Sequence, residues 1–158
     1  GVRPSKTELS LVEVIPSSSN LSSIFILNIY SSPSDHRQRF RTIIAKATRL
    51  AGLSPLVVAG DFNSPFRAWN YPYDSAKGRS LWQETGDADL SLITDPMFPT
   101  RRGTSTTRDS TPDLAFVKNA GSVGWENLLT DLGSDHYITV TKLQMEAKSK
   151  EVYLRGLG

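Results

Sequence analysis

Four short polar motifs, each beside an apolar segment, contain the residues of this sequence that are best suited to chemistry. They are Tyr30, the pair Asp61 and Asn63, Asp113, and the string Ser134-Asp135-His136. A carboxylate can hold a metal ion or accept a proton, whereas an amide or a phenol can donate a hydrogen bond to a phosphate. An Asp–His pair fixes the tautomer of the imidazole. We expect these groups to line one cleft at the ends of adjacent strands, where together they suit hydrolysis of a phosphodiester.

The central stretch, residues 56–65, must position the pair Asp61 and Asn63. Its first four residues are apolar and two are β-branched, which predicts a short strand buried on both faces that Gly60 ends. Two residues apart on an extended segment, Asp61 and Asn63 would point the same way. The alternative is a turn in which both side chains bind the backbone, because Asp and Asn are common in turns.

The apolar periodicity predicts the remaining elements. Strands at residues 9–15 and 24–30 would form an antiparallel hairpin, and a helix would cover residues 40–51, with Ser34 or Asp35 as its N-cap and Gly52 at its end. We expect a second helix at residues 77–84 and further strands at residues 90–93, 113–117, 123–129 and 138–143.

Two connecting segments have compositions suited to binding. Residues 66–73 are aromatic and basic and contain a proline, so we expect a surface loop whose aromatic rings stack on bases or, equally, close the edge of the core. Residues 97–112 form a long polar loop, and such loops in compact domains tend to be functional. Its Arg101, Arg102 and Arg108 are the best candidates for contact with a phosphate backbone.

The overall composition sets the limits of the interpretation. The 158 residues are 38% hydrophobic and 22% charged, as in an ordinary folded domain rather than a disordered chain. The absence of cysteine excludes disulfides, thiolate zinc sites and a cysteine nucleophile. A net charge of +2 permits a polyanionic partner without requiring one. No apolar run predicts a membrane span, so we expect no membrane partner and a nuclear or cytoplasmic location.

These motifs resemble those of the endonuclease/exonuclease/phosphatase superfamily. Its signature strings G-D-F-N and S-D-H occur at residues 60–63 and 134–136, with an intervening Asp113 beside apolar residues. Residues 99–105 and 112–114 especially resemble the apurinic-like endonuclease domain of non-LTR retrotransposon reverse transcriptases, and the resemblance covers about residues 24 to 140. It implies an α/β (α+β) fold, a DNase I-like αββα sandwich. It also implies hydrolysis of DNA with Mg²⁺ or Mn²⁺, in a domain at residues 1–143 followed by a tail or linker at 144–158.

The resemblance also implies a role for each predicted residue. Asp61 would activate or orient the attacking water, while Asn63 and Tyr30 would contact the scissile phosphate. Asp135 and Asp61 would hold the divalent metal. His136 would bind phosphate or act as an acid or base, and Asp113 would orient it. The predicted substrate-binding residues are Thr100, Arg101, Arg102 and Ser134.

Two strings mimic family motifs at the wrong place in the chain. Ser34-Asp35-His36 precedes a predicted helix, where capping explains it better. Gln83-Glu84 is similar to the family's metal-binding Q-E string, but that string belongs before the tyrosine strand. We therefore expect Glu84 at the surface.

The resemblance further implies that a segment is missing. The family has one strand bearing Asn and another bearing the metal-anchoring Glu before the tyrosine strand, but only 29 residues precede Tyr30 here, and Glu8 and Glu13 stand in the wrong place. We expect an N-terminally truncated domain that lacks about a third of the sandwich and is weak or inactive. Its exposed sheet edge would pair with a second copy or with a missing N-terminal segment.

Two other functions stay open at this point. The same fold serves phosphoinositide and sphingolipid phosphoesterases, although the arginine-rich loop mildly favours a nucleic acid over a lipid headgroup. Alternatively, the chain is a non-catalytic remnant that binds DNA or a protein. DNA binding that depends on salt but occurs without cleavage would indicate the remnant.

Overall fold

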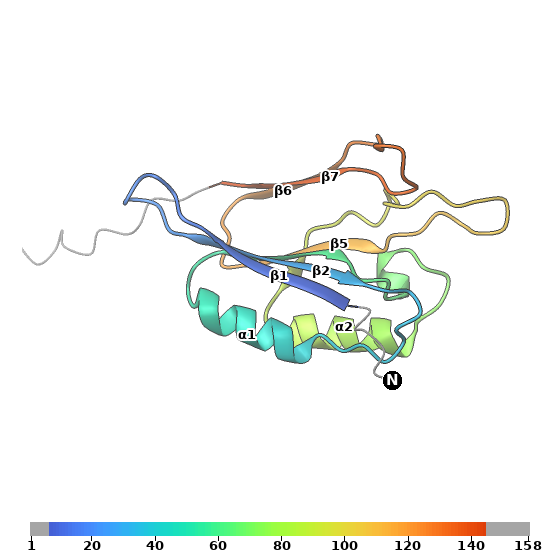
Figure 1. The fold of residues 1–158 in the computed structure, drawn as a ribbon, viewed down its shortest axis with the longest axis horizontal. Helices are drawn as coiled ribbons and strands as arrows, with labels where there is room; N and C mark the ends of the chain where they lie inside the picture. The colour runs from blue at the N-terminus through green and yellow to red at the C-terminus, as the bar shows by residue number, and fades with distance from the viewer. Residues whose placement is uncertain (1–6, 145–158) are drawn as a thin grey trace, which may run out of the picture.

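The computed structural model describes residues 7–144, which form three layers (Figure 1). Two helices, α1 (Arg41–Ala51) and α2 (Ala76–Asp87), cover one face of a five-stranded sheet, and a separate hairpin lies on the other side. In spatial order the strands of the sheet are β1 (Thr7–Val14), β2 (Ile24–Ser31), β3 (Leu56–Asp61), β5 (Asp113–Lys118) and β4 (Ser91–Leu92). The hairpin consists of β6 (Val123–Asn127) and β7 (Thr139–Leu143). The predicted α/β class is confirmed.

The strand pairing brings three of the predicted site residues into one row. β1 and β2 form the predicted antiparallel hairpin, and β2 continues through α1 into the parallel neighbour β3. β5 then pairs antiparallel with β3. The register places Tyr30 opposite Asp61 and Asp61 opposite Asp113, so their side chains share the sheet face that the helices leave uncovered.

The core between the helices and the sheet holds the end of β3 in place. Ile44 and Ala47 of α1 are buried against the sheet. Phe62, which directly follows Asp61, is fully buried and meets Phe40 and Phe116 edge to face, with ring centroids 5.3 and 5.8 Å apart. Such aromatic pairs each contribute about 0.5–1.5 kcal/mol beyond the area they bury. The backbone next to Asp61 is therefore fixed by a packed aromatic cluster.

The start of α1 differs from the prediction, and so does the place of Glu84. Neither Ser34 nor Asp35 caps the helix, which begins only at Arg41 after a turn at residues 32–35. Instead, the carboxylate of Glu84 on α2 accepts the N–H of Phe40 at 3.0 Å. Glu84 is only 6% exposed, so the prediction that it lies at the surface is wrong. A hydrogen bond between helices satisfies the amide that a local cap would otherwise have satisfied.

Residues 66–73 are only partly the surface loop that we predict. They contain a short 3₁₀ turn, η1 (Arg67–Trp69), and Trp69 is fully buried. Its indole N–H donates to the carbonyl of Ser64 at 2.7 Å, and its ring packs on Phe66 and Phe116. Tyr73, by contrast, is 53% exposed. The segment thus both closes the core and leaves an aromatic ring accessible.

The ends of the chain add little to this description. The predicted tail, residues 144–158, lies outside the described residues except for its first position. Between residues 7 and 144, neither helix is long and apolar enough to cross a membrane.

Candidate active site

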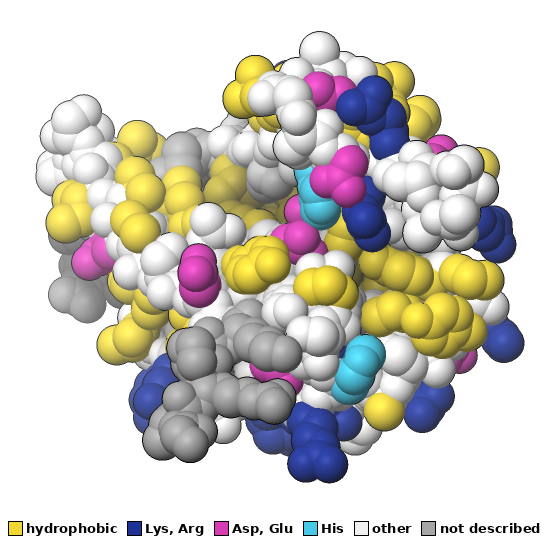
Figure 2. Space-filling view, turned by 45° about the vertical axis from the view of Figure 1, so that its right-hand side comes forward, with side chains coloured by type: hydrophobic (Ala, Val, Ile, Leu, Met, Phe, Trp, Pro, Cys, Tyr) yellow, Lys and Arg dark blue, Asp and Glu magenta, His cyan; other side chains and the backbone are white. Residues whose placement is uncertain are grey.

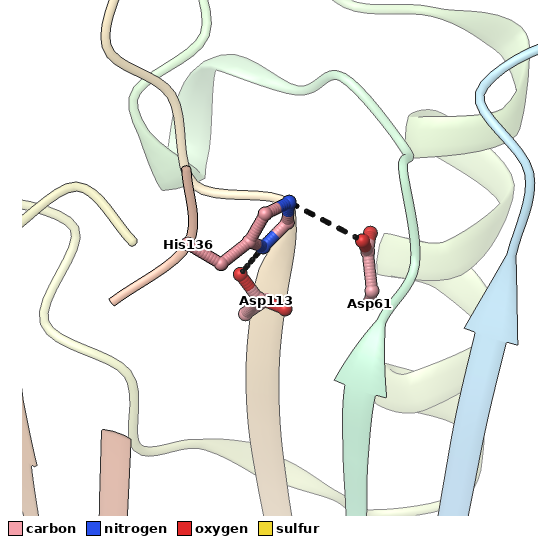
Figure 3. A group of neighbouring side chains, drawn as sticks. All are labelled: Asp61, Asp113 and His136. Atoms are coloured by element: carbon pink, nitrogen blue, oxygen red, sulfur yellow. Dashed lines mark hydrogen bonds and ion pairs between the residues drawn. The ribbon is translucent and has the colours of Figure 1, made fainter. Parts of the chain in front are cut away.

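Three of the predicted residues converge where β3 ends and β5 begins (Figure 3). Asp61 is the last residue of β3, and Asp113 is the first residue of the neighbouring β5. His136 comes from the loop before β7, so tertiary folding has to bring it there. A carboxylate or ring-nitrogen atom from each of the three lies within 4.8 Å of the others. The structure therefore places Asp61, Asp113 and His136 in one cluster.

The backbone of the loop at residues 100–102 holds His136 over the sheet. Tyr137 N–H donates to the carbonyl of Thr100, and Arg102 N–H donates to the carbonyl of Asp135, both at 2.8 Å. Ser134, a predicted substrate-binding residue, accepts the N–H of His136 on its Oγ at 2.9 Å. The S-D-H string is thus pinned to the edge of the arginine-rich loop.

Asp113 orients the imidazole of His136. Nδ1 of His136 lies 2.6 Å from Oδ2 of Asp113, and because a carboxylate only accepts, Nδ1 carries the proton. Nε2 then faces the carboxylate of Asp61, 3.8 Å from its Oδ2. The expected Asp–His pair is present, and its free ring nitrogen points into the space beside Asp61 (Figure 3).

Both carboxylates hold their protons more tightly than ordinary aspartates do. Burial, reinforced by repulsion from Asp113, raises the pKa of Asp61 to about 6, although His136 opposes the change. Burial also raises the pKa of Asp113, against the attraction of His136 and a hydrogen bond with Thr100. Like charges in a poorly hydrated site disfavour the ionised form. Carboxylates with pKa values perturbed in this way are typical of functional sites. A bound cation or proton there offsets the repulsion between the charges.

One atom of this cluster has no protein partner. Within the described part of the chain, Oδ1 of Asp61 is buried and accepts no hydrogen bond. A buried carboxylate oxygen left unpaired is costly, and a bound cation or a proton removes that cost. The chemistry of the donors, carboxylate oxygens with one imidazole, also fits a divalent metal ion. The residues present therefore fit the metal that the sequence predicts.

Asp135, the second predicted metal ligand, lies at the rim. Its Oδ2 accepts from Nε of Arg101 at 2.9 Å, and its Oδ1 lies 3.8 Å from Nε2 of His136. The guanidinium of Arg101 holds the pKa of this carboxyl below its usual range. Arg102 likewise makes an ion pair, at 2.7 Å, with Asp131. Both arginines thus tie the long loop to residues 131–135, and their predicted contact with phosphate stays a prediction.

Asn63 and Tyr30 flank Asp61 in different ways. The strand ends at Asp61, and Asn63 adopts a left-handed φ of 44°, so the predicted extended segment through both residues is wrong. The amide of Asn63 donates to the carbonyl of Ser31 at 2.8 Å, which ties the turn after β3 to the end of β2. Tyr30 lies in the row beside Asp61 and is exposed. It is therefore accessible to a substrate.

Thr100 supports Asp113 from below the surface of the site. It is fully buried, and its Oγ1 accepts the N–H of Asp113 at 3.2 Å. This contact fixes the backbone that presents Asp113 to His136. The role of Thr100 as a phosphate ligand stays a prediction.

Lys77 is a site residue that the sequence analysis missed. Its ammonium group is buried, donates to the carbonyl of Ser32 at 3.2 Å and attracts the carboxylate of Asp61. Burial lowers its pKa to about 8. The sequence contained a sign that Lys77 has a special role, because a lysine in the first turn of a helix is electrostatically unfavourable. A lysine two residues after the N-cap Ser75, at the second position of α2, therefore needs a stabilising contact elsewhere.

Comparison with known structures supports the fold assignment. The endonuclease domain of TRAS1, a telomere-specific non-LTR retrotransposon, matches 86% of this chain and 63% of its own, with 18% identity and a TM-score of 0.67. An endonuclease/exonuclease/phosphatase family protein from Bacteroides thetaiotaomicron matches 90% and 66%, with 12% identity and a TM-score of 0.56. D. rerio TDP2, complexed with a single-strand DNA product, matches 89% and 62%, with 10% identity and a TM-score of 0.52. These likenesses show a DNase I-like fold.

The sequence comparisons assign the family. A search of curated proteins gave no match. The chain spans less than two thirds of the length of the TRAS1 and TDP2 structures. A family model for endonuclease–reverse transcriptases matches residues 24–140, which include the whole cluster around Asp61. On these grounds the chain belongs to the endonuclease–reverse transcriptase family of the endonuclease/exonuclease/phosphatase superfamily.

Proposed function

We propose that this chain contains a divalent-metal-dependent phosphodiesterase site that nicks DNA, as in a retroelement endonuclease. The observation that carries the proposal is the Asp113–His136 pair, 2.6 Å apart, beside the carboxylate of Asp61. Oδ2 of Asp61 lies 3.8 Å from Nε2 of His136, and its buried Oδ1 has no hydrogen-bond partner among the described residues. Family membership and the TDP2 complex with single-strand DNA support a nucleic-acid substrate. Mg²⁺ or Mn²⁺ is the proposed ion.

Each residue of the cluster has a distinct task in this proposal. Asp61, with Asp135 at the rim, would hold the metal ion, which supplies positive charge beside the phosphoryl oxygens. His136 keeps its proton on Nδ1 through Asp113 and presents Nε2 to a phosphate oxygen or a water. Tyr30 would donate its phenol hydrogen to the phosphate. These are the groups that stabilise charge or transfer protons in the reaction.

Plasmid nicking tests this proposal. We expect residues 1–158 with Mg²⁺ to convert supercoiled DNA into the open-circular form, and EDTA to stop the reaction. His136→Ala should lower the rate at least about 100-fold, because one acid–base group typically contributes this much. The control Arg49→Ala removes an exposed cation at the end of α1 and should nick as the wild type does.

Other results, from this assay or from parallel assays of lipid hydrolysis and DNA binding, would support other functions. Nicking that survives His136→Ala would contradict the assigned site. Turnover of phosphoinositides or sphingomyelin, but not of DNA, would indicate a lipid phosphoesterase. Salt-dependent DNA binding by a chain that never cleaves would support a non-catalytic remnant.

We further propose that the isolated chain nicks slowly, because among residues 7–144 the edge strand β1 has only β2 as a neighbour in the sheet. β1 is the outermost strand, and its Leu9, Val12 and Val14 are exposed. About a third of each longer structure that the chain matches has no counterpart here. The proposed occupant of the edge is a strand-forming N-terminal segment, which would hydrogen-bond to the outer edge of β1. Light scattering of residues 1–158 would instead detect a second copy as the occupant.

A further inference from the structure

A second cleft, of about 330 Å³, lies beside the candidate active site. It shares Asn63 and Arg101 with that site, and the rest of its lining includes Pro33, His36, Pro65, Tyr71, Tyr73 and Lys77. Figure 2 shows both histidines of the chain on one face, with hydrophobic and basic side chains next to them. A cleft of this volume is at the small end of ligand pockets and is large enough for a single nucleotide unit.

Two cations line this cleft, and each can still bind an anion. Lys77 is only 2% exposed, and its hydrogen bond to the carbonyl of Ser32 uses one of its three N–H groups. Arg101 binds Asp135 through Nε, which leaves the terminal nitrogens of the guanidinium for a further acceptor. A buried ammonium is costly unless it is paired. The carboxylates of Asp35 and Asp61 attract the ammonium of Lys77. A phosphate between Lys77 and Arg101 would add a direct ion pair.

Another part of the lining is aromatic. Tyr71 is half-buried and packs against the hydrophobic core, whereas Tyr73 is 53% exposed. Pro33 and Pro65 complete the apolar surface. An accessible tyrosine in an apolar cleft is a surface on which a nucleobase stacks, whatever its identity. The cleft thus joins a phosphate-binding end to a base-stacking surface.

We propose that this cleft binds the nucleotide next to the scissile phosphodiester, with its phosphate between Lys77 and Arg101 and its base against Tyr73. The inference rests on the proposed function, because it takes DNA as the substrate. Asn63 and Arg101 border both sites. A single DNA strand would therefore run from the cluster at His136 into the cleft while staying in contact with the protein surface. The cleft has room for one base, so recognition here is limited to a single position.

Binding measured without cleavage tests the proposal. Fluorescence anisotropy in EDTA would measure the affinity of the protein for a labelled 20-mer DNA. The same measurement would use a series of this DNA in which each member has a single abasic residue at a different position. Tyr73→Ala should weaken binding of the intact DNA roughly 5- to 100-fold, the range expected for one lost stacking contact. Tyr73→Phe keeps the ring and should bind within about twofold of the wild type.

The matched control is Phe98→Ala. Phe98 is 47% exposed, about as much as Tyr73, but it lies outside the cleft, near Asn127 of β6. This variant should bind DNA as the wild type does. One abasic position should weaken binding to the wild type yet have no effect in Tyr73→Ala, because the stacking partner is already gone. Thermal unfolding would check that each variant is folded.

Several results would overturn the inference. They are full affinity in Tyr73→Ala, an equal loss in Phe98→Ala, a wild type insensitive to every abasic position, or no DNA binding at all. The two proposals fail separately, because anisotropy needs no hydrolysis. Tyr73-dependent binding without nicking would contradict the proposed activity and support the cleft. His136-dependent nicking together with full DNA affinity in Tyr73→Ala would support the proposed activity and contradict the proposed role of the cleft.

Discussion

Asp61→Asn should make this protein more stable at neutral pH while it abolishes nicking, and the size of the gain follows from the burial of the carboxylate. Asp61 is only 16% exposed at its side chain and lies beside Asp113. Its pKa is raised from 3.8 to about 6, mainly by burial. At about 1.36 kcal/mol per unit of pKa, this shift means that ionised Asp61 lowers the free energy of unfolding by about 3 kcal/mol. Asparagine has a similar shape and removes the charge.

The sign of the effect depends on pH. Because the folded state binds the proton of Asp61 more tightly than the unfolded state, wild-type stability falls as the pH rises from about 4 to about 6. Asparagine does not titrate. The two proteins should therefore be about equally stable near pH 4, and the variant should be more stable by up to about 3 kcal/mol above pH 6. Excess Mg²⁺ should narrow this gap by stabilising only the wild type.

Urea unfolding between pH 4 and pH 8, followed by tryptophan fluorescence, measures this difference. The control is Asp87→Asn, which removes an exposed carboxylate paired with Arg41 at 3.3 Å. It should change stability by less than about 0.5 kcal/mol at every pH, since exposed ion pairs contribute little. An Asp61→Asn variant that is less stable than wild type at pH 7, or whose advantage does not vary with pH, would refute the reasoning.

Two further predictions concern the scaffold, with thermal or urea unfolding as the measurement. Glu84→Ala should cost about 1–3 kcal/mol because it leaves the N–H of Phe40 buried and unpaired, whereas Glu84→Gln should retain most of that stability. An equal loss in both variants would contradict the hydrogen-bond explanation. Gly60→Ala should cost about 2 kcal/mol or more, since a Cβ would stand 1.9 Å from a carbonyl of β2 at a φ of 137°. Gly86→Ala faces open space in α2 and should stabilise the fold by roughly 0.5–1 kcal/mol.

Local patterns in the sequence were enough to predict most elements and the family. The apolar run at residues 56–59 predicts the central strand, and the periodicity around Ile44 predicts the helix that Gly52 ends. The G-D-F-N and S-D-H strings identify the superfamily, which the family match at residues 24–140 confirms. These features depend on neighbours close in sequence, so a linear pattern is sufficient to show them.

The tertiary structure decided the features that join distant segments. The carboxylate of Glu84 on α2 accepts the N–H at the start of α1, and Trp69 turns an expected loop into the core. The buried cation Lys77 attracts the carboxylate of Asp61. No periodicity predicts such contacts, because each depends on packing between residues far apart in the chain.

The sequence by itself determined which groups are available for phosphodiester chemistry and that each lies beside an apolar segment. Only the tertiary structure decided that Nδ1 of His136 meets Asp113, that Nε2 faces Asp61, and that one oxygen of Asp61 stays unpaired. Distances of a few ångströms and the loss of water around a charge set these properties. Both arise only when β3, β5 and the loop before β7 pack together.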